Sequence, residues 1–502
     1  MTAPARPSGL RRASSEATMP AVAALILGTL LGMAWASRPS YWFDEAATLS
    51  AAERSPGRLW TLLHHVDAVH GLYYGLMSGW VRLVGTGEAA TRAFSAVGLG
   101  VTCGLVALLG AELGGRRLAW SSGLAAVVLP GLAWSGTEAR QFSWSAALAT
   151  AATLALLRAR GTGRARHWIA YGAALTLGAY LFLFSLLLVV AHLLTLLLLP
   201  GRAARSWWAA TGVAAGLSLP LAVTAVGQFD RQLGWLSLEP ASVLVQMGFS
   251  QYFLSSTTSG SRSAMLGAAA LLALTVLLVI RCVRAAGRSR EARDVLRVAV
   301  PWAVLPSSVL ALVSVLGHPV YQQRYLTFCA PGVALVIGAG LVATSLRPQA
   351  IFVVGLATVV AAFPVLVGQK QVDSKNRDNY RVLADFLGPR GRDVPGVVLS
   401  AAGEEGILVS YPERVHGVRV LNRGVDPLAS TGLWGTLHGP RRTVLAPGTE
   451  VGLVSLTAHP ERARRWVRWL RVHDCRAVGR VRERRYTARV YHCRAARRRD
   501  DP

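Results

Sequence analysis

The sequence predicts a polytopic α-helical membrane protein with about eleven transmembrane helices, followed by a small α/β domain at the C-terminal end. Composition is the first reason: of the 502 residues, 52% are hydrophobic and only 16% are charged, which is typical of membrane proteins. The second reason is that apolar runs of spanning length recur from about residue 19 to residue 368. The third is that these runs then stop, so residues 369–502 are expected to be soluble.

The chain is strongly basic, with a formal net charge of +27 and a mean hydropathy of +0.39. A basic balance is also found in proteins that bind nucleic acid. Here, however, most arginines fall between the apolar runs, as the positive-inside rule predicts for cytoplasmic connections of a membrane protein. We therefore expect membrane lipids, and no nucleic acid, among the partners.

The charges on the connections predict the number and the direction of the spans. With eleven spans, every arginine-rich connection falls on one side, including 281–297 with its six arginines. The N-terminal tail, residues 1–18, is then cytoplasmic, with residues 1–16 expected to be disordered, and residues 369–502 are extracytoplasmic. The membrane domain would be 19–368, with a first outer loop at 38–91. The expected spans are about 19–37, 92–111, 118–134, 141–157, 168–184, 186–200, 208–226, 263–280, 298–316, 326–346 and 350–368.

Two alternatives affect this topology. Arg11-Arg12, an apolar core and Ala34-Trp35-Ala36 resemble a cleavable signal peptide, but the charge-free run is about 20 residues long, enough to span. The segment Gly71–Val81 is too short to span and carries two tyrosines and a tryptophan, which suit the headgroup level. We expect it to lie in the outer interface. The alternative is a further span that would invert everything downstream.

The C-terminal domain is predicted from short apolar runs that alternate with helical patterns. In an extracytoplasmic compartment Cys475 and Cys493 could form a disulfide, and the alternative is two free thiols. No two of the five cysteines have CxxC spacing, so no cysteine metal site is expected. The expected strands are Val394–Ala401, Gly406–Ser410, Val418–Leu421 and Glu450–Leu456, and the expected helices are Asn379–Leu387 and Pro460–Arg471.

Two adjacent carboxylates, Asp44 and Glu45, follow the first span in the stretch Tyr41–Thr48. Acids at the mouth of a membrane helix are costly unless they face water or a partner. An acid in this position could take a proton from a substrate hydroxyl. The alternative is a solvated acid pair that merely ends the helix.

Other polar residues at the ends of the expected spans fall on the same outer face. This pattern suits a cavity at the boundary of lipid and water, because a transporter would place ionisable residues at mid-membrane depth. Only His192 lies deep in a span, and we expect it to be a packed core residue rather than a proton relay. The residues of the outer set are Asp67, His70, Arg92, Glu138, Arg140, His318, Gln322, Gln323 and Arg324.

The order of these motifs resembles that of the C-type glycosyltransferase superfamily (GT-C), in particular the bacterial relatives of protein O-mannosyltransferases and aminoarabinose transferases. The resemblance covers about residues 19–345. Its most specific part is the acidic motif after the first span combined with the Tyr-Tyr segment. The motifs are Trp42-Phe43-Asp44-Glu45, Asp67-x-x-His70-x-x-Tyr73-Tyr74, Arg92-x-x-Ser95, Glu138-Ala139-Arg140-x-Phe142 and Gln323-Arg324-Tyr325-Leu326.

This resemblance implies an enzyme of the bacterial plasma membrane that takes a sugar from a polyprenyl-phosphate carrier. The sugar passes, with inversion, to a hydroxyl of a glycan, lipid or protein acceptor on the outer face. Mannose is the expected sugar, and arabinose or aminoarabinose is the alternative. A lipid-linked sugar transporter or flippase is the alternative from another class.

The resemblance also implies roles for individual residues. Asp44 would be the general base, and Glu45 would assist it or bind a divalent metal ion. Arg324, Arg140 and, more weakly, Arg92 would hold the carrier phosphate, since a guanidinium can bind two phosphate oxygens. The alternative for each arginine is an anchor to lipid headgroups.

The remaining site residues are expected to line the pocket or the acceptor side. An Asp/His pair suits a divalent ion, but two ligands are too few to assert one. Many relatives have prolines next to this histidine, whereas this chain has His70-Gly71-Leu72, which leaves the acceptor open. The expected lining residues are Asp67, His70, Tyr73, Tyr74, Glu138, Gln323 and Tyr325, with Glu45, Asp67 and His70 as possible metal ligands.

Overall fold

The structure, a computed structural model, divides into two compact units that we describe separately. The first unit comprises residues 1–36, 67–73 and 89–370, and the second comprises residues 37–66, 74–88 and 371–502. The first eight residues of the expected N-terminal tail lie outside the described part of the chain. Residues 9–16, which were expected to be disordered, are instead the first part of helix α1 (Gly9–Met33). The structure describes residues 9–199, 204–234, 236, 239–254, 261–342, 348–446 and 448–494.

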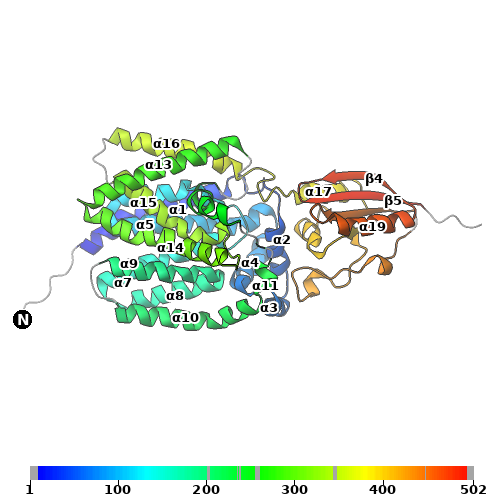
Figure 1. The fold of residues 1–502 in the computed structure, drawn as a ribbon, viewed down its shortest axis with the longest axis horizontal. Coiled ribbons are helices and arrows are strands. Elements are labelled where there is room, and N and C mark those ends of the chain that lie inside the picture. Colours follow the sequence, from blue (N-terminus) through cyan, green and yellow to red (C-terminus); the bar gives the residue numbers. More distant parts are fainter. Residues whose placement is uncertain are drawn as a thin grey trace, which may run out of the picture. The chain divides into compact units, whose positions relative to one another are not determined.

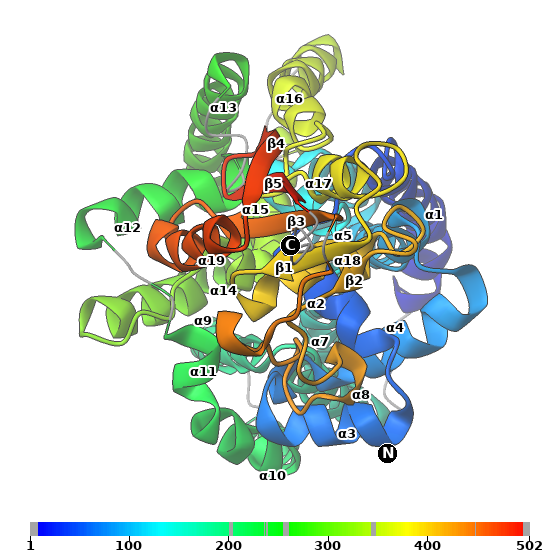
Figure 2. The same cartoon turned by 90° about the vertical axis from the view of Figure 1, so that its right-hand side faces the viewer.

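The first unit is helical, and its long helices pack side by side. Helix α7 packs against α8, which in turn packs against α10 (Figure 1), and α13 packs against α16, as the end-on view in Figure 2 shows. The long helices are α1 (Gly9–Met33), α5 (Glu88–Val128), α7 (Phe142–Thr162), α8 (Ala165–Leu181), α9 (Leu188–Leu198), α10 (Ala204–Gly227), α13 (Arg262–Ala286), α14 (Arg290–Val315), α15 (Ala330–Val342) and α16 (Pro348–Gly368). The short elements are η1 (Ala68–His70), α6 (Pro130–Ser135), η2 (Leu183–Leu187), α11 (Phe229–Leu233), η3 (Pro240–Ser242), α12 (Val243–Val245), the π-helix η4 (Gln246–Leu254) and η5 (Gln323–Cys329).

Helix α5 is two helices in one run. Gly114 (φ −159°) and Gly115 (φ 72°) leave helical geometry, and the positive φ of Gly115 favours glycine, which has no Cβ to clash. The break falls where the sequence predicts a connection between two spans. A second glycine permits close packing, because a Cβ on Gly100 would lie 2.0 Å from Thr29 Oγ1 of α1.

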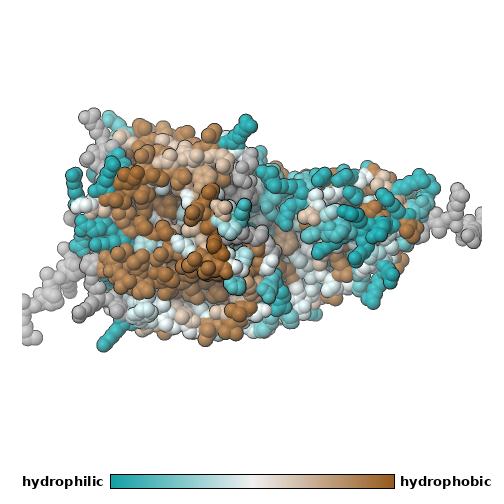
Figure 3. All heavy atoms as spheres, in the orientation of Figure 1, coloured by the Kyte–Doolittle hydropathy of each residue, from teal (hydrophilic) through white to brown (hydrophobic). Residues whose placement is uncertain are grey.

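Seven helices among the described residues are long and apolar enough to cross a membrane, and two shorter apolar helices cover Ala17–Met33 and Leu183–Leu198. Hydrophobic side chains cover much of the face of the helical unit that Figure 3 shows. Each of the eleven predicted spans overlaps a helix among the described residues. The seven long helices are Glu88–Val128, Phe142–Thr162, Arg205–Gly227, Arg262–Ala286, Arg290–Val315, Gln323–Val342 and Gln349–Gly368.

The second unit contains a five-stranded mixed sheet in the order β2-β1-β3-β5-β4. Strand β1 runs parallel to β2 and β3, whereas β5 runs antiparallel to β3 and β4. The strands are β1 (Gly396–Leu399), β2 (Arg419–Val420), β3 (Glu450–Leu456), β4 (Cys475–Arg482) and β5 (Tyr486–Cys493). The helices are α2 (Phe43–Ala52), α3 (Pro56–His65), α4 (Gly71–Val84, which begins in the first unit), α17 (Tyr380–Leu387), η6 (Ala402–Glu404), α18 (Glu405–Ser410), η7 (Pro427–Ala429), η8 (Pro440–Arg442) and α19 (Pro460–Val472).

Most of the first outer loop belongs to this second unit, whereas the sequence placed it in the membrane domain. Tyr41, Ala46 and Leu49 lie in the same buried hydrophobic cluster as Ile407 and Tyr411. The hydroxyl of Tyr411 accepts a hydrogen bond from Tyr41 N over 2.9 Å. Helix α2 is therefore part of the core of the sheet unit.

One expectation for this unit was wrong, and two strands were not predicted. The run 406–410 is helix α18 and not a strand, because a short apolar run fits either structure and the tertiary contacts decide. Here Glu404 accepts hydrogen bonds from Ser400 N and Ala401 N just ahead of the helix, and α18 packs against α2. Strands β4 and β5 were not predicted, since β4 carries three arginines and lacks a continuous apolar run.

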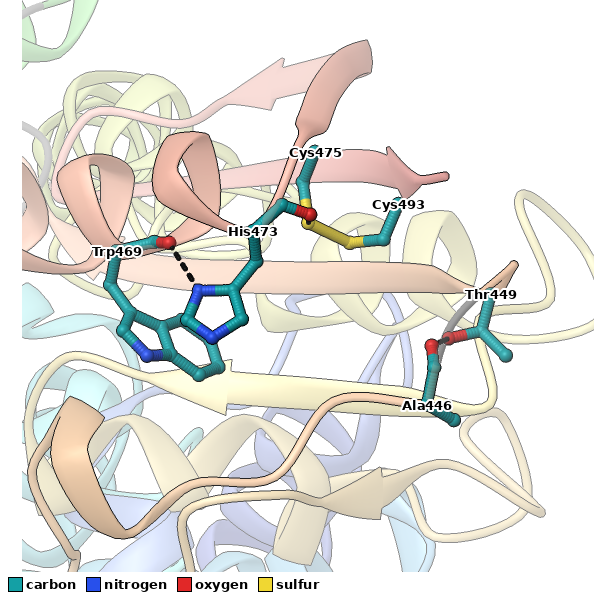
Figure 4. Close-up of a disulfide and its surroundings, with 6 residues drawn as sticks. All are labelled: Ala446, Thr449, Trp469, His473, Cys475 and Cys493. Carbon is teal, nitrogen blue, oxygen red and sulfur yellow. Dashed lines mark hydrogen bonds between the residues drawn. A yellow bond between two sulfur atoms is a disulfide. The ribbon is translucent and has the colours of Figure 1, made fainter. Parts of the chain in front are cut away.

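A disulfide joins the first residue of β4 to the last residue of β5, Cys475 to Cys493 (Figure 4). The two residues face one another in the register of the antiparallel pair. His473, just after α19, lies beside the ring of Trp469 and hydrogen-bonds to its carbonyl oxygen over 2.8 Å. The disulfide thus closes the hairpin opposite its turn.

Candidate active site

Helix α2 presents the two acids of the sequence motif in its first turn. The turn carries the unsatisfied backbone N–H groups and the positive end of the helix dipole, so it stabilises carboxylates. Asp44 is half-buried, whereas Glu45 is 0% exposed. Asp44 is therefore the acid of the pair that a substrate can reach.

Arg54 holds α2 to the segment that follows β2. This guanidinium is 1% exposed and donates to Ser50 O at the end of α2. It also donates to the carbonyl oxygens of Pro427, Ser430 and Gly432 at 2.6–2.7 Å. Near the start of α2, Phe43 packs on Trp434 with ring centroids 5.4 Å apart. The helix with the acids is thus fixed by contacts at both ends.

In the first unit, two side chains from the turn that precedes α7 contact the ring nitrogens of His70. The Arg140 guanidinium donates to Nε2 over 3.1 Å, and the side-chain amide of Gln141 lies 2.8 Å from Nδ1. Arginine can only donate, so Nε2 must accept and the ring is neutral with its hydrogen on Nδ1. A half-turn of the Gln141 amide would present its oxygen to that hydrogen.

The pKa of His70 lies well below its usual range. Burial is the main cause, and the positive charges of Arg140 and Arg324 act in the same direction. The effect shows that two arginines from distant parts of the chain lie within electrostatic reach of one imidazole. Two guanidinium groups around a neutral ring form a local positive field, which suits a phosphate.

Aromatic rings lie beside the cluster formed by His70, Arg140 and Arg324. The His70 ring is parallel to that of Phe182, with centroids 6.4 Å apart, and Tyr325 lies 5.1 Å from Phe182 and 6.1 Å from Phe142. Arg324 lies over the Tyr325 ring at 5.8 Å. Arg324 also lines a pocket; its lining residues are Gly131, Trp134, Ser250, Gln251, Gln323, Arg324 and Thr327.

A chain of buried hydrogen bonds supports the turn that carries Arg140. Tyr73 OH and Ser95 Oγ lie 3.2 Å apart, and Ser95 Oγ donates to the carbonyl oxygen of Arg140 over 2.9 Å. Tyr73 and Ser95 are both 0% exposed. Tyr73 therefore acts on the backbone of the site and does not line a pocket.

The other predicted site residues lie as follows. Arg92 is fully buried and donates to Ala36 O over 2.6 Å, which favours a structural role. Asp67 adopts a left-handed backbone (φ 60°) and accepts from Gln232 Nε2. Glu138 is 0% exposed in the turn before α7, and Tyr74 is 0% exposed in the second unit.

The possible metal ligands do not form a recognisable metal site. Among the described residues no group of three or more His, Cys, Asp or Glu side chains could hold a metal ion. In the first unit Asp67 is engaged by a glutamine amide and His70 by Arg140 and Gln141. Both side chains are thus used for interactions within the protein.

Comparison with known proteins gives the fold. The sequence matches no protein-family model, and a search of curated proteins gives no match. The structure is similar to the crystal structure of ArnT, an aminoarabinose transferase from Cupriavidus metallidurans, in the apo state. The TM-score is 0.59 at 12% identity, over 95% of this chain and 98% of that chain. The chain has the fold of ArnT.

Two further solved structures are similar to this chain. ArnT bound to undecaprenyl phosphate has a TM-score of 0.53 at 12% identity, over 97% of this chain and 98% of that chain. The apo oligosaccharyltransferase of Archaeoglobus fulgidus has a TM-score of 0.49 at 12% identity, over 88% of this chain and 70% of that chain. The likeness to ArnT establishes the fold, and it extends over the C-terminal part as well as the helices.

One buried acid of the second unit was missed at the level of sequence. Asp378 lies in the polar segment between α16 and α17 and is 0% exposed. Nothing in the neighbouring residues distinguishes it from an acid in a solvated loop, because its burial results from packing against the distant residues of β5.

Proposed function

We propose that this protein is a glycosyltransferase that moves a sugar from a polyprenyl-phosphate carrier to an acceptor hydroxyl. The observation that carries the proposal is the convergence of Arg140 and Arg324 on a neutral His70, within a GT-C fold. A phosphate leaving group needs such cations. ArnT, whose fold the chain shares, has been crystallised with undecaprenyl phosphate.

In this reaction Asp44 acts as the general base. The acceptor oxygen forms a bond to the anomeric carbon from the face opposite the carrier, so the configuration inverts. The bond from that carbon to the phosphate oxygen breaks, and the phosphate leaves with the electron pair. The hydroxyl proton passes to Asp44, the partly exposed acid of the pair.

The arginines act on the leaving group. Arg140 and Arg324 neutralise the charge that develops on the carrier phosphate, which is stabilisation of the transition state by groups already in place. Neutral His70 accepts from Arg140 and adds no charge of its own, so it orients the guanidinium. The rings of Phe182 and Tyr325 limit the access of water to this cluster, which strengthens its field.

The sugar, the acceptor and the topology complete the proposal. Mannose is the first donor to test, on the resemblance to protein O-mannosyltransferases, and arabinose or aminoarabinose is the second. The acceptor is a glycan, lipid or protein. The chain crosses a bacterial plasma membrane eleven times, with its N-terminus cytoplasmic and with the site and residues 369–502 extracytoplasmic, because the arginine-rich connections fall on one side.

The test uses the purified full-length protein with a panel of polyprenyl-phosphate sugars and a mixed acceptor extract. Release of free polyprenyl phosphate with a gain of sugar on the acceptor is the expected result for one donor. Asp44→Asn should lower the rate by about 10²–10⁴-fold, the usual contribution of a general base. Glu53→Gln, an exposed acid just past the other end of α2, should leave the rate unchanged.

A flippase would give a different pattern. It would translocate the lipid-linked sugar without transfer and would tolerate Asp44→Asn if this acid were outside its path. Transfer at the wild-type rate by Asp44→Asn would refute the role of Asp44 as base. Cysteine labelling from outside should reach a cysteine introduced in 400–490 and miss one in 284–293, and the reverse pattern would refute the topology.

A further inference from the structure

The last part of the second unit is dense in arginine. Residues 460–494, which form α19, β4 and β5, contain twelve arginines and three acids. Among the described residues only one of the twelve, Arg485, forms an ion pair, and its partner is Asp378. A solvated surface usually mixes charges of both signs, so this excess of one sign is unusual.

Helix α19 directs its arginines away from the core. Its buried residues Ala463, Trp466 and Leu470 recur at helical spacing, on the side that packs against β3 and β4. The acid of the first turn, Glu461, lies 3.2 Å from His459 and is thus already engaged. The other positions of the helix carry the exposed arginines Arg462, Arg464, Arg465, Arg468 and Arg471.

The hairpin adds further arginines on the same side of the sheet as α19. Arg480 of β4 lies directly opposite Arg489 of β5. Alternate residues of a strand point to the same side, so Arg489 shares the side of Tyr491, which packs in the cluster of Trp466 of α19. Like charges directly opposite destabilise a strand pair. We call the arginine face Arg464, Arg468, Arg480, Arg482 and Arg489.

The two sets of arginines lie at the same end of the sheet. Leu456, the last residue of β3, is paired with Tyr486 at the start of β5, and α19 begins four residues later at Pro460. The first turns of α19 are therefore beside the end of the hairpin that holds Arg480 and Arg482. Hydrophilic side chains cover much of the sheet unit on the side of α19 (Figures 1 and 3).

We propose that the arginine face is the docking surface for the acceptor, and that this acceptor is an anionic glycan polymer. Its repeating phosphate or carboxylate groups match the repeating guanidinium groups, each of which can bind two oxygens of such an anion. The role of the polymer as acceptor rests on the proposed function, whereas its binding to the arginine face does not.

The position of the arginine face favours a polymer over a small anion. Val490 of β5 lies in the buried cluster of Ala46 from the acid helix α2, whereas its neighbour Tyr491 lies in the cluster of Trp466 from α19. The arginine face and α2 therefore lie on opposite sides of the sheet. A packed layer is about 10 Å thick, so a ligand that reaches both must extend on the order of 20 Å.

The exposed residues of α19 favour a hydrated polyanion over a lipid surface. A helix that lies in a membrane interface exposes an apolar face beside its basic residues. Helix α19 instead buries its apolar face against the sheet and exposes one large hydrophobic residue, Val472, at its end. The guanidinium groups are thus presented to water without apolar side chains that could enter the acyl chains.

The first test measures binding to the full-length protein in phosphatidylcholine nanodiscs, without a donor. The probe is fluorescent poly(glycerol phosphate), followed by anisotropy. We expect affinity that falls with salt, and no binding of neutral dextran. The triple variant Arg468→Gln, Arg480→Gln, Arg482→Gln should bind about tenfold or more weakly. The slope of log affinity against log salt should fall by about 2–3, since each neutralised phosphate contributes about 0.7–0.9 in nucleic acids.

The matched control removes three exposed arginines of the same unit that lie outside the arginine face, and it should bind as the wild type does. Absent or salt-independent binding by the wild type would overturn the proposal without any variant. Tighter capture by phosphatidylglycerol vesicles than by the polymer, lost in the triple variant, would identify a membrane surface and also overturn it. The control variant is Arg58→Gln, Arg390→Gln, Arg419→Gln.

The second test identifies the fraction that accepts the sugar. The acceptor extract is separated into lipids, neutral polymers and polymers retained by an anion exchanger. Transferred sugar should appear on the retained polymers, and the triple variant should raise KM for this fraction about tenfold at unchanged kcat, in line with its weaker binding. Sugar on the lipids or neutral polymers alone would overturn the docking role. No transfer to any fraction would overturn the proposed function and the acceptor role, whereas the binding result would stand.

Discussion

The guanidinium of Arg140 donates a hydrogen bond to Nε2 of His70 over 3.1 Å, so the imidazole acts as an acceptor for a cation. This geometry requires a neutral ring. It also fixes Arg140 from two sides, because Ser95 holds the carbonyl oxygen of the same residue. The histidine of the first-loop motif is thus a support for an arginine, a role that differs from the metal ligand considered from the sequence.

His70 should make the protein less stable in acid. Its pKa is lowered in the folded state by burial and by Arg140 and Arg324. Below about pH 6.5, the usual value for histidine, the unfolded chain therefore binds a proton that the native state does not. Stability should fall as pH drops from 7 to 5. His70→Phe keeps the ring against Phe182 and should reduce this fall in thermal unfolding. A fall as steep as that of the wild type would contradict the prediction.

Arg140 and Arg324 should determine the affinity for the carrier phosphate. A hydrogen bond to a charged group contributes about 1.5–3 kcal/mol, so Arg140→Gln or Arg324→Gln should weaken binding of polyprenyl phosphate roughly tenfold or more. Lysine at either position should restore only part of the affinity, since it lacks the planar pair of donors. Binding is measured by tryptophan fluorescence, with Arg288→Gln, in the connection between α13 and α14, as control. Unchanged affinity in both variants would refute the phosphate role.

Arg54 should be required for the position of the acid helix. Its removal leaves buried carbonyl oxygens at Pro427, Ser430 and Gly432 without their donor. We expect Arg54→Met to destabilise the second unit by about 2–4 kcal/mol and to lower kcat more than it raises KM. The exposed Arg58, with a single 3.4 Å bond to Ala429 O, is the matched control as Arg58→Met. Equal effects of the two substitutions would contradict the prediction.

The disulfide should stabilise the C-terminal hairpin. Cys475 and Cys493 are 18 residues apart, and closing a loop of this size contributes about 3 kcal/mol in the chain-entropy model. Replacing both with alanine should lower the unfolding temperature of the second unit while the helical unit keeps its own. Blocking of free thiols in intact cells before and after reduction tests the compartment, since a disulfide persists in an oxidising environment. Two reduced thiols in untreated cells would contradict the extracytoplasmic placement.

The sequence anticipated the helices more fully than the site. Each apolar run has the length and composition of a helix whatever surrounds it, so each of the eleven predicted segments overlaps a helix among the described residues. A connection within α5 was also foreseen, because Arg116 and Arg117 separate the apolar runs at about 92–111 and 118–134. In contrast, β4 and the helical state of 406–410 depend on partners far away in the chain, and local pattern could not reveal them.

The sequence by itself determined that the chain is a helical membrane protein with an acid motif after its first apolar run, since hydrophobicity and adjacency are local properties. Only the tertiary structure decided that α2 belongs to the core of the sheet unit, that His70 supports Arg140, and that Asp378 is buried and paired with Arg485. The physical reason is that the burial and the charge environment of a polar side chain are set by segments distant in sequence. Its chemistry is therefore fixed only once those segments have packed.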